Sequence, residues 1–333
     1  MEWILFVGAG MLSWVLCYPI KTWLEKHQVW DCPNARSSHE KPVLRGGGLA
    51  PLVVVVLALG VWVASAKTGF GVAWIWAVLL LGYISFRDDQ GEVPIQRRLA
   101  VQLFVSVGVL FAMAGSTLPA WQLTLAVFGL VAFTNYVNFM DGINGLVPGQ
   151  LILMSVGTTV VCGTAEWGTG VPVIIALVLA GAVAGFLPFN FPSPKMFMGD
   201  VGSVCLGFSF GVLIFWMAVL GQDKELGYSL LPLTAYFFIE GTVAIIRRMW
   251  RREKWWQPHR EHFYQRLVRR GWSHMRTSGI IWGLQCLVTI LTWWQLRSGW
   301  SIWLLWLATV LVWGAFFFYA ESLFRRSRRK AAD

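Results

Sequence analysis

Stretches of about 20 apolar residues, the length that crosses a bilayer as one α-helix, recur along this chain of 333 residues. The chain is 56% hydrophobic and only 13% charged, which leaves too little polar surface for a soluble domain of this length. We therefore expect an all-α, polytopic integral membrane protein in which residues 1–333 form a single multi-span domain. The eleven expected spans are 3–20, 48–66, 70–86, 99–115, 119–138, 146–164, 171–189, 203–221, 228–246, 278–296 and 300–320.

The basic residues are divided unevenly between the two ends of these spans. With the N-terminus outside, 24 of the 27 Lys and Arg residues fall on the cytoplasmic side, in segments 21–45, 87–98, 247–276 and 325–330 and at Lys195. Cytoplasmic loops of membrane proteins carry such an excess. We therefore expect the N-terminus outside and the C-terminus in the cytoplasm. The net charge of +10 then reflects topology and attraction to anionic membrane lipid, and no nucleic acid is expected as a partner.

Four aspartates, Asp88, Asp89, Asp141 and Asp200, adjoin the ends of apolar spans. Carboxylates beside hydrocarbon are costly, so they tend to line functional sites. The expected topology puts all four on the cytoplasmic face, where they could gather into one phosphate-handling pocket. The cytoplasmic loops expected to carry the chemistry are 21–47, 87–98, 138–146, 189–203 and 247–277.

Arginines accompany the first two of these loops. Three glycines at 46–48 follow a segment that contains Arg36, His39 and Arg45. Such glycines let backbone N–H groups approach an anion, and arginines suit phosphate oxygens. A polar turn with a flexible helix entry would have the same sequence. In the second loop, Asp88-Asp89 with Arg98 could hold a divalent cation or orient a phosphate nucleophile. A solvated turn is the plain alternative there.

The third and fourth loops add amides and one more acid. Asn135, Asn138 and Asp141 recur every third residue and form a polar stripe on one face of the fifth span. This stripe is better suited to lining a cavity than to facing lipid. Asp200 stands at the start of the eighth span, where a helix N-terminus also binds anions. A simple Asp N-cap would explain Asp200 equally well.

The last loop contains His259, His262 and Arg266, whose spacing would put two imidazoles and a guanidinium on one helical face. No Cys or carboxylate set completes a zinc site, so contact with a pyrophosphate or sugar is favoured over a metal. Glu240 is the one acid well inside a span. An intramembrane carboxylate suggests function, and a hydrogen-bonded packing role within the bundle is equally compatible.

Taken together, these motifs resemble the polyprenyl-phosphate N-acetylhexosamine-1-phosphate transferase superfamily (glycosyltransferase family 4). That superfamily includes the phospho-MurNAc-pentapeptide translocase and the undecaprenyl-phosphate GlcNAc-1-phosphate transferases. The resemblance covers nearly the whole chain in order. Its motifs are Pro33-Asn34-x-Arg36-Ser37-Ser38-His39 with Gly46-Gly47-Gly48, Asp88-Asp89 with Arg98 and Gln102, Asn138 with Asp141-Gly142 and Gly145, Phe197-Met198-Gly199-Asp200-x-Gly202-Ser203, and the histidine loop.

The resemblance implies transfer of an N-acetylhexosamine-1-phosphate from a UDP-sugar to undecaprenyl phosphate at a bacterial cytoplasmic membrane, with release of UMP. It implies that Asp200 binds Mg²⁺, with Mn²⁺ as a substitute. Asp88 and Asp89 would position the lipid phosphate, Asp141 would shape the catalytic cleft, and a homodimer would be compatible with the family. The substrate-binding residues it implies are Arg36, His39, Arg45, Arg98, Asn138, Asn144, His259, His262 and Arg266.

Two departures from the superfamily bear on the sugar. Asn144 stands where the family often has a second aspartate. The histidine loop has His259-x-x-His262 followed by Tyr264-Gln265 in place of His-x-His-His. This form resembles the branch that initiates O-antigen synthesis from 6-deoxy donors such as UDP-FucNAc or UDP-QuiNAc, with GlcNAc as the other candidate. A transporter of lipid-linked sugars would instead need broken helices and acids near the midplane. An inactive scaffold homologue would release no UMP from any UDP-N-acetylhexosamine.

Overall fold

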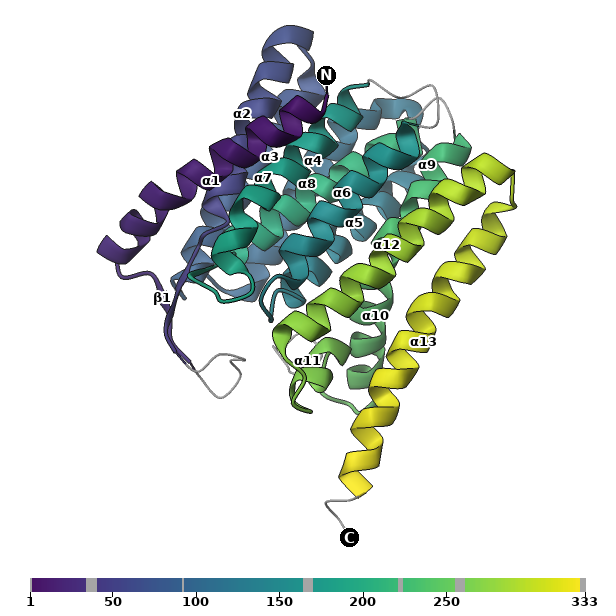
Figure 1. The fold of residues 1–333 in the computed structure, drawn as a ribbon. Coiled ribbons are helices and arrows are strands. Elements are labelled where there is room, and N and C mark those ends of the chain that lie inside the picture. Colours follow the sequence, from purple (N-terminus) through teal and green to yellow (C-terminus); the bar gives the residue numbers. More distant parts are fainter. Residues whose placement is uncertain are drawn as a thin grey trace.

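The structure is a computed structural model, and it describes residues 2–33, 41–91, 93–163, 170–220, 224–254 and 261–329. Its helices run side by side as one bundle, and the two ends of the chain lie at opposite ends of it (Figure 1). The all-α expectation is confirmed. The α-helices are α1 (Trp3–Lys26), α2 (Leu49–Ala66), α3 (Gly69–Asp89), α4 (Ile95–Ala114), α5 (Ala120–Phe139), α6 (Leu146–Cys162), α7 (Val171–Asn190), α8 (Gly199–Leu220), α9 (Lys224–Leu230), α10 (Ala235–Trp250), α11 (Phe263–Val268), α12 (His274–Ser298) and α13 (Ile302–Arg329).

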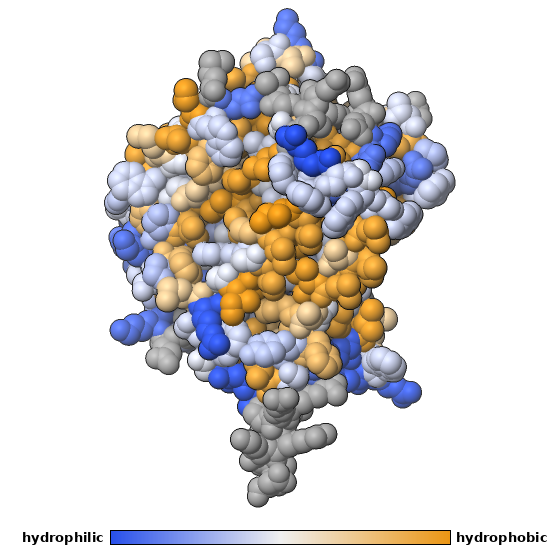
Figure 2. All heavy atoms as spheres, turned by 45° about the vertical axis from the view of Figure 1, so that its right-hand side comes forward, coloured by the Kyte–Doolittle hydropathy of each residue, from blue (hydrophilic) through white to orange (hydrophobic). Residues whose placement is uncertain are grey.

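Within the described ranges, ten helical segments are long and apolar enough to cross a membrane. α6 is a shorter apolar helix of 17 residues, so these segments and α6 together account for the eleven expected spans. Figure 2 shows apolar side chains across the middle of one face and hydrophilic ones toward its two ends. This is the surface that a bilayer-embedded bundle requires. The chain is a multi-pass membrane protein.

The expected ninth span, 228–246, is not one continuous helix. Its polypeptide is divided into α9, a short 3₁₀ turn at Leu231–Thr234 and α10, which together form the crossing segment Lys224–Trp250. Pro232 lies in the 3₁₀ turn and has no N–H to donate to the preceding turn, which accounts for the break. Helices also extend into several of the expected loops: α1 runs to Lys26, and α10 runs to Trp250.

The loops at one end of the bundle form a small sheet that the sequence did not indicate. Its strands are β1 (Trp30–Asp31), β2 (Val43–Arg45) and β3 (Met196–Phe197), in the order β1-β2-β3. β2 pairs antiparallel to β1 and parallel to β3, with Arg45 opposite Phe197. The sheet therefore fixes the segment before α2 beside the segment that leads into α8.

The contact between α1 and α7 is made by small residues. Gly181 and Gly185 are four residues apart on α7, and a Cβ on Gly185 would lie 2.1 Å from the carbonyl oxygen of Gly10 on α1. Such spacing lets two helices approach closely where no hydrophobic effect drives them together. The close approach of the two backbones leaves no room for a methyl group at Gly185.

We predict that Gly185→Ala lowers the stability of the purified protein by about 1–3 kcal/mol, the usual cost of overpacking a core. The matched control is Gly60→Ala on α2, since a Cβ at Gly60 meets no atom within 4 Å. Thermal unfolding in detergent measures both variants. Equal midpoints for Gly185→Ala and Gly60→Ala would contradict the close α1–α7 contact.

Candidate active site

Arg45, the cation at the centre of the site, is the last residue of strand β2 in the small sheet. Arg45 N–H donates to Val29 O at 3.0 Å, and its side chain points toward the first turn of α8. The Arg45 Nε lies 2.7 Å from Asp89 Oδ1, and its Nη2 lies 2.7 Å from Asp200 Oδ1. One guanidinium therefore bridges aspartates that are 111 residues apart in the chain.

A second guanidinium makes the matching bridge from the other side. Arg98, in the first turn of α4, pairs with Asp88 and lies 3.2 Å from Asp200 Oδ2. The side chains of Asp88 and Asp200 keep 14% and 13% of their surface exposed. Both carboxylates are thus neutralised in part and still reachable by a ligand. A planar, permanently charged guanidinium suits this bridging between oxygen anions.

Asp89 has a different environment from its neighbour Asp88. Its side chain is fully buried, and its two carboxylate oxygens accept hydrogen bonds from the N–H groups of Asp200 at 2.8 Å and Val201 at 3.2 Å. These N–H groups belong to the first turn of α8 and have no partner within that helix. Asp89 therefore caps α8 from another helix, and Asp200 is not itself the N-cap.

The turn after α5 carries Asp141, and the amide stripe that precedes it faces the bundle. Asn135 Nδ2 donates to Gln102 Oε1 at 2.6 Å, and Asn138 Nδ2 donates to Ser203 Oγ at 3.0 Å. The stripe therefore ties α5 to α4 and α8, which agrees with the expectation that it avoids lipid. These bonds set the position of the α5 end from which Asp141 follows.

Asp141 interacts electrostatically with the rest of the cluster. Burial raises the pKa of its carboxyl group to about 7, helped by the negative charges of Asp200 and Asp89 and opposed by Arg45. With Asp141 the site contains four carboxyl groups and two guanidinium groups. When all six are ionised, two negative charges remain, and a divalent cation would balance them.

Asn144 and Asn190 connect the Asp141 turn to the neighbouring segments. Asn144 Nδ2 donates to Pro192 O at 3.0 Å, and Ser278 Oγ donates to Asn144 O at 2.9 Å. Asn190 Oδ1 accepts from Gly145 N–H at 2.7 Å. Asn144 is thus engaged by the backbone after α7 and by α12. Its predicted contact with substrate stays a prediction.

Two of the three glycines at 46–48, Gly47 and Gly48, do not present free N–H groups to an anion. Gly47 N–H and Gly48 N–H donate to Phe197 O and Met198 O, both at 2.9 Å. A Cβ on Gly48 would lie 2.3 Å from the Cα of Gly202, so the start of α2 packs directly on the start of α8. Gly47 and Gly48 therefore serve the packing of α2 on α8, a role that neither of the two expectations for these glycines included.

The histidine loop is only partly described. Arg36, His39 and His259 lie outside the described residues. α11 begins at Phe263, so His262 is its N-cap and does not share a helical face with Arg266. Arg266 is 3% exposed, pairs with Glu321 and lies 3.7 Å from Glu261. The expected helical face of two imidazoles and a guanidinium is therefore wrong, because the helix starts after His262.

The donor groups fit a hard cation that needs few protein ligands. Over the ranges for which the structure gives positions, no three His, Cys, Asp or Glu side chains are arranged to hold a metal ion. Mg²⁺ is commonly bound by one or two carboxylates, several waters and the phosphates of a substrate. The partly exposed side chains of Asp88 and Asp200 suit such a site, whereas the Asp89 carboxylate, whose two oxygens already accept hydrogen bonds, does not.

Comparison with known proteins gives the class to which this arrangement belongs. Residues 71–218, which include Asp88, Asp89, Asp141 and Asp200, match glycosyl transferase family 4. A probable undecaprenyl-phosphate N-acetylglucosaminyl 1-phosphate transferase of Bacillus subtilis is 30% identical over 76% of this chain and 73% of its own length. The chain therefore belongs to glycosyl transferase family 4.

Two further relatives have related names. A decaprenyl-phosphate N-acetylglucosaminephosphotransferase of Mycobacterium tuberculosis is 26% identical over 82% of this chain and 77% of its own length. A phospho-N-acetylmuramoyl-pentapeptide-transferase of Lacticaseibacillus paracasei is 29% identical over 71% of this chain and 78% of its own length. The superfamily inferred from the sequence motifs is confirmed, and the protein is a phosphotransferase.

Sequence reasoning did not single out two residues that hold the site together. These residues are Asn190 and Tyr264. Both are buried and bond to the Asp141 turn or to the end of the helix before it. A polar side chain next to an apolar span is the one signal that could have indicated Asn190.

The raised pKa of Asp141 predicts a specific pH dependence of stability. The carboxyl has an ordinary pKa of 3.8 when unfolded and about 7 when folded, so the folded protein binds more protons between these values. Stability of metal-free protein should therefore fall as the pH rises from about 4 to about 7. Asp141→Asn should remove this part of the decline. Thermal unfolding measured across pH in a chelator tests it, and identical pH slopes for both proteins would contradict it.

Proposed function

We propose that this protein transfers an N-acetylhexosamine-1-phosphate from a UDP-sugar to undecaprenyl phosphate and releases UMP. The product would be a lipid-linked sugar that starts the synthesis of a cell-surface glycan of the O-antigen type. The observation that carries the proposal is the cluster of Asp88, Asp89 and Asp200 bridged by Arg45 and Arg98 at one end of an apolar bundle. The names of the relatives support the same reaction class.

The proposed reaction makes one bond and breaks one bond. An oxygen of the acceptor phosphate attacks the phosphorus that carries the sugar, and the bond from that phosphorus to UMP breaks. A phosphate monoester has a second pKa of about 6, so the acceptor is largely a dianion near neutral pH and needs orientation more than deprotonation. Direct transfer without a covalent aspartyl intermediate is therefore favoured.

Phosphoryl transfer depends mainly on alignment and charge neutralisation. The guanidinium groups of Arg45 and Arg98 would neutralise phosphate oxygens as they now neutralise carboxylates. Asp88, paired with Arg98 and partly exposed, would set the position of the acceptor phosphate. Asp89 would contribute by holding α8, and with it Asp200, in place.

Asp200, together with Asp88, would hold the Mg²⁺ ion, for which Mn²⁺ could substitute. The ion would supply charge neutralisation at the pyrophosphate of the donor. Support comes from the two negative charges that Arg45 and Arg98 leave unbalanced in the fully ionised cluster. His259 and His262 remain the proposed contacts to the donor sugar, with Arg36 and His39 on the acceptor or pyrophosphate side.

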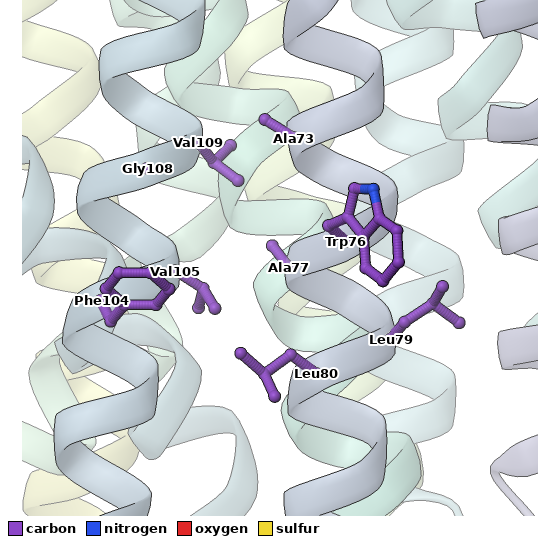
Figure 3. Close-up of a pocket in the computed structure, with 9 residues that line it drawn as sticks. All are labelled: Ala73, Trp76, Ala77, Leu79, Leu80, Phe104, Val105, Gly108 and Val109. Atoms are coloured by element: carbon purple, nitrogen blue, oxygen red, sulfur yellow. The ribbon is translucent and has the colours of Figure 1, made fainter.

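The same two helices that carry Asp88 and Arg98 also offer an apolar surface for a lipid chain. A groove of about 440 Å³ lies between α3 and α4 and is lined by apolar side chains and glycine. Figure 3 shows Ala77, Leu80 and Val105 between these helices. Leu80 precedes Asp88 by eight residues on one helix, or about 12 Å of helix rise. A hydrocarbon chain in this groove would have its phosphate near the arginine-bridged cluster.

The proposed location is the bacterial cytoplasmic (inner) membrane, with the site facing the cytoplasm. The excess of Lys and Arg in the loops at the end of the bundle that carries the site supports this orientation. The proposed donor is a UDP-N-acetylhexosamine, either GlcNAc or a 6-deoxy sugar such as FucNAc or QuiNAc. The His262-x-Tyr264-Gln265 sequence supports the 6-deoxy group, and the names of two relatives support GlcNAc.

We predict that Asp200→Asn lowers Mg²⁺-dependent UMP release by at least about a hundredfold, the usual loss when one preorganised electrostatic group is removed. The assay contains purified protein, undecaprenyl phosphate, Mg²⁺ and a panel of UDP-N-acetylhexosamines. The control is Glu25→Gln, which removes an exposed acid paired with Lys21 on α1. Full activity of Asp200→Asn would contradict the metal assignment. No UMP from any donor with the wild-type protein would instead indicate a scaffold homologue.

A further inference from the structure

Glu240 on α10 is the acid that lies deepest in a span, and in the described part of the chain its hydrogen bond and ion pair go to α11 and its N-cap, not to the aspartate cluster. Its side chain is fully buried, its Oε1 accepts a hydrogen bond from Phe263 N–H at 2.5 Å, and the same oxygen lies 3.6 Å from His262 Nδ1. A buried carboxylate is costly unless donors surround it. Glu240 therefore stabilises the first turn of α11 from a neighbouring helix.

The first turn of α11 is fixed from two other directions. His262 and Gln265 form a reciprocal capping box. The His262 side chain accepts from the backbone N–H of Gln265, and the Gln265 side chain accepts from the backbone N–H of His262. On the opposite side, Arg266 pairs with Glu321 of α13 and stacks over Phe324 at 4.8 Å. A helix of six residues could not be stable alone, and these contacts hold it in one orientation.

Tyr264 extends from this fixed turn to the end of α5. Its side chain is fully buried, its ring stacks on His262 at 5.8 Å, and its hydroxyl donates to Phe139 O at 3.2 Å. Phe139 O lies in the last turn of α5, where carbonyl groups lack partners within the helix. The hydroxyl also occupies the space beside Gly142, since a Cβ there would lie 2.3 Å from it.

Asp141 lies between Phe139 and Gly142, so Tyr264 contacts the chain on both sides of this aspartate. We propose that Glu240 and Tyr264 are positioning residues that hold the Asp141 turn in place through the first turn of α11. Only the kinetic part of this inference rests on the proposed function. The structural part, that residues 139–146 are held by the Tyr264 hydroxyl, stands independently of any substrate.

The primary test is hydrogen exchange measured by mass spectrometry on the purified protein in detergent. Tyr264→Phe removes one hydroxyl and keeps the ring, so the fold should survive. We expect exchange of the amides in 139–146 to rise about tenfold, the effect of losing one typical hydrogen bond. The control is Tyr83→Phe on α3, where the side chain is 63% exposed on the surface of the bundle. In this variant, exchange of the amides in 139–146 should stay as in the wild type.

The Glu240 contact is tested by a pair of substitutions. Glu240→Leu removes the acceptor for Phe263 N–H, whereas Glu240→Gln keeps an uncharged acceptor in the same place. We expect faster exchange in 261–268 and 139–146 for the Leu variant and near wild-type exchange for the Gln variant. Equal exchange in the Leu variant and the wild type would overturn the role of Glu240.

Kinetics distinguish a positioning role for Tyr264 from a general loss of stability. If Tyr264 acts through Asp141, turnover by Tyr264→Phe combined with Asp141→Asn should equal turnover by Asp141→Asn alone. Effects that multiply would overturn the inference, as would unchanged exchange at 139–146 in Tyr264→Phe. Absence of UMP release by the wild-type protein would count against the proposed function only, because the exchange experiment needs no substrate.

Discussion

Four acidic side chains gather at the end of a largely apolar bundle, and the two guanidinium groups of Arg45 and Arg98 make this arrangement stable. Carboxylates in a low-dielectric setting repel one another strongly unless a cation lies between them. Arg45 connects Asp89 to Asp200, and Arg98 connects Asp88 to Asp200. The small sheet that carries Arg45 and the start of α4 that carries Arg98 are therefore integral parts of the site. Two negative charges remain in the fully ionised cluster, and a divalent cation would balance them.

The four aspartates divide into different roles according to their surroundings. Asp89 is buried and saturated by backbone N–H groups, so it organises α8 and is not free to bind a ligand. The side chains of Asp88 and Asp200 stay partly exposed and pair with the arginines. Asp141 follows the end of α5, and burial raises the pKa of its carboxyl group to about 7. Adjacent residues such as Asp88 and Asp89 can thus differ in function, because one pairs with Arg98 and stays partly exposed and the other faces a helix end.

Much of the architecture follows from the sequence because each helix is encoded by its own apolar run. The clustering of Asp88, Asp141 and Asp200 also follows, since loops after alternate spans must lie at the same end of a bundle. The sheet could not be predicted, because strands of two or three residues show no periodicity. The role of Gly48 depends on contact with Gly202, a residue far away in the chain.

The histidine loop shows a different limit of sequence reasoning. The spacing of His262 and Arg266 suggested one helical face, but periodicity applies only within a helix, and α11 begins at Phe263. Arg266 is drawn instead to Glu321, an acid on α13 that no local pattern connects to it. The role of Tyr264 depends on Phe139 and Gly142, which lie beside its hydroxyl but far from it in the chain.

The central claim is that this cluster transfers a sugar together with its phosphate, and not the sugar alone. Mass spectrometry of the lipid extracted after incubating purified protein with undecaprenyl phosphate, Mg²⁺ and the UDP-N-acetylhexosamine it accepts tests this claim most directly. We predict a product that carries both phosphates, the one from the acceptor and the one from the donor, joined to one N-acetylhexosamine. A product with a single phosphate, which would accompany release of UDP, would contradict it.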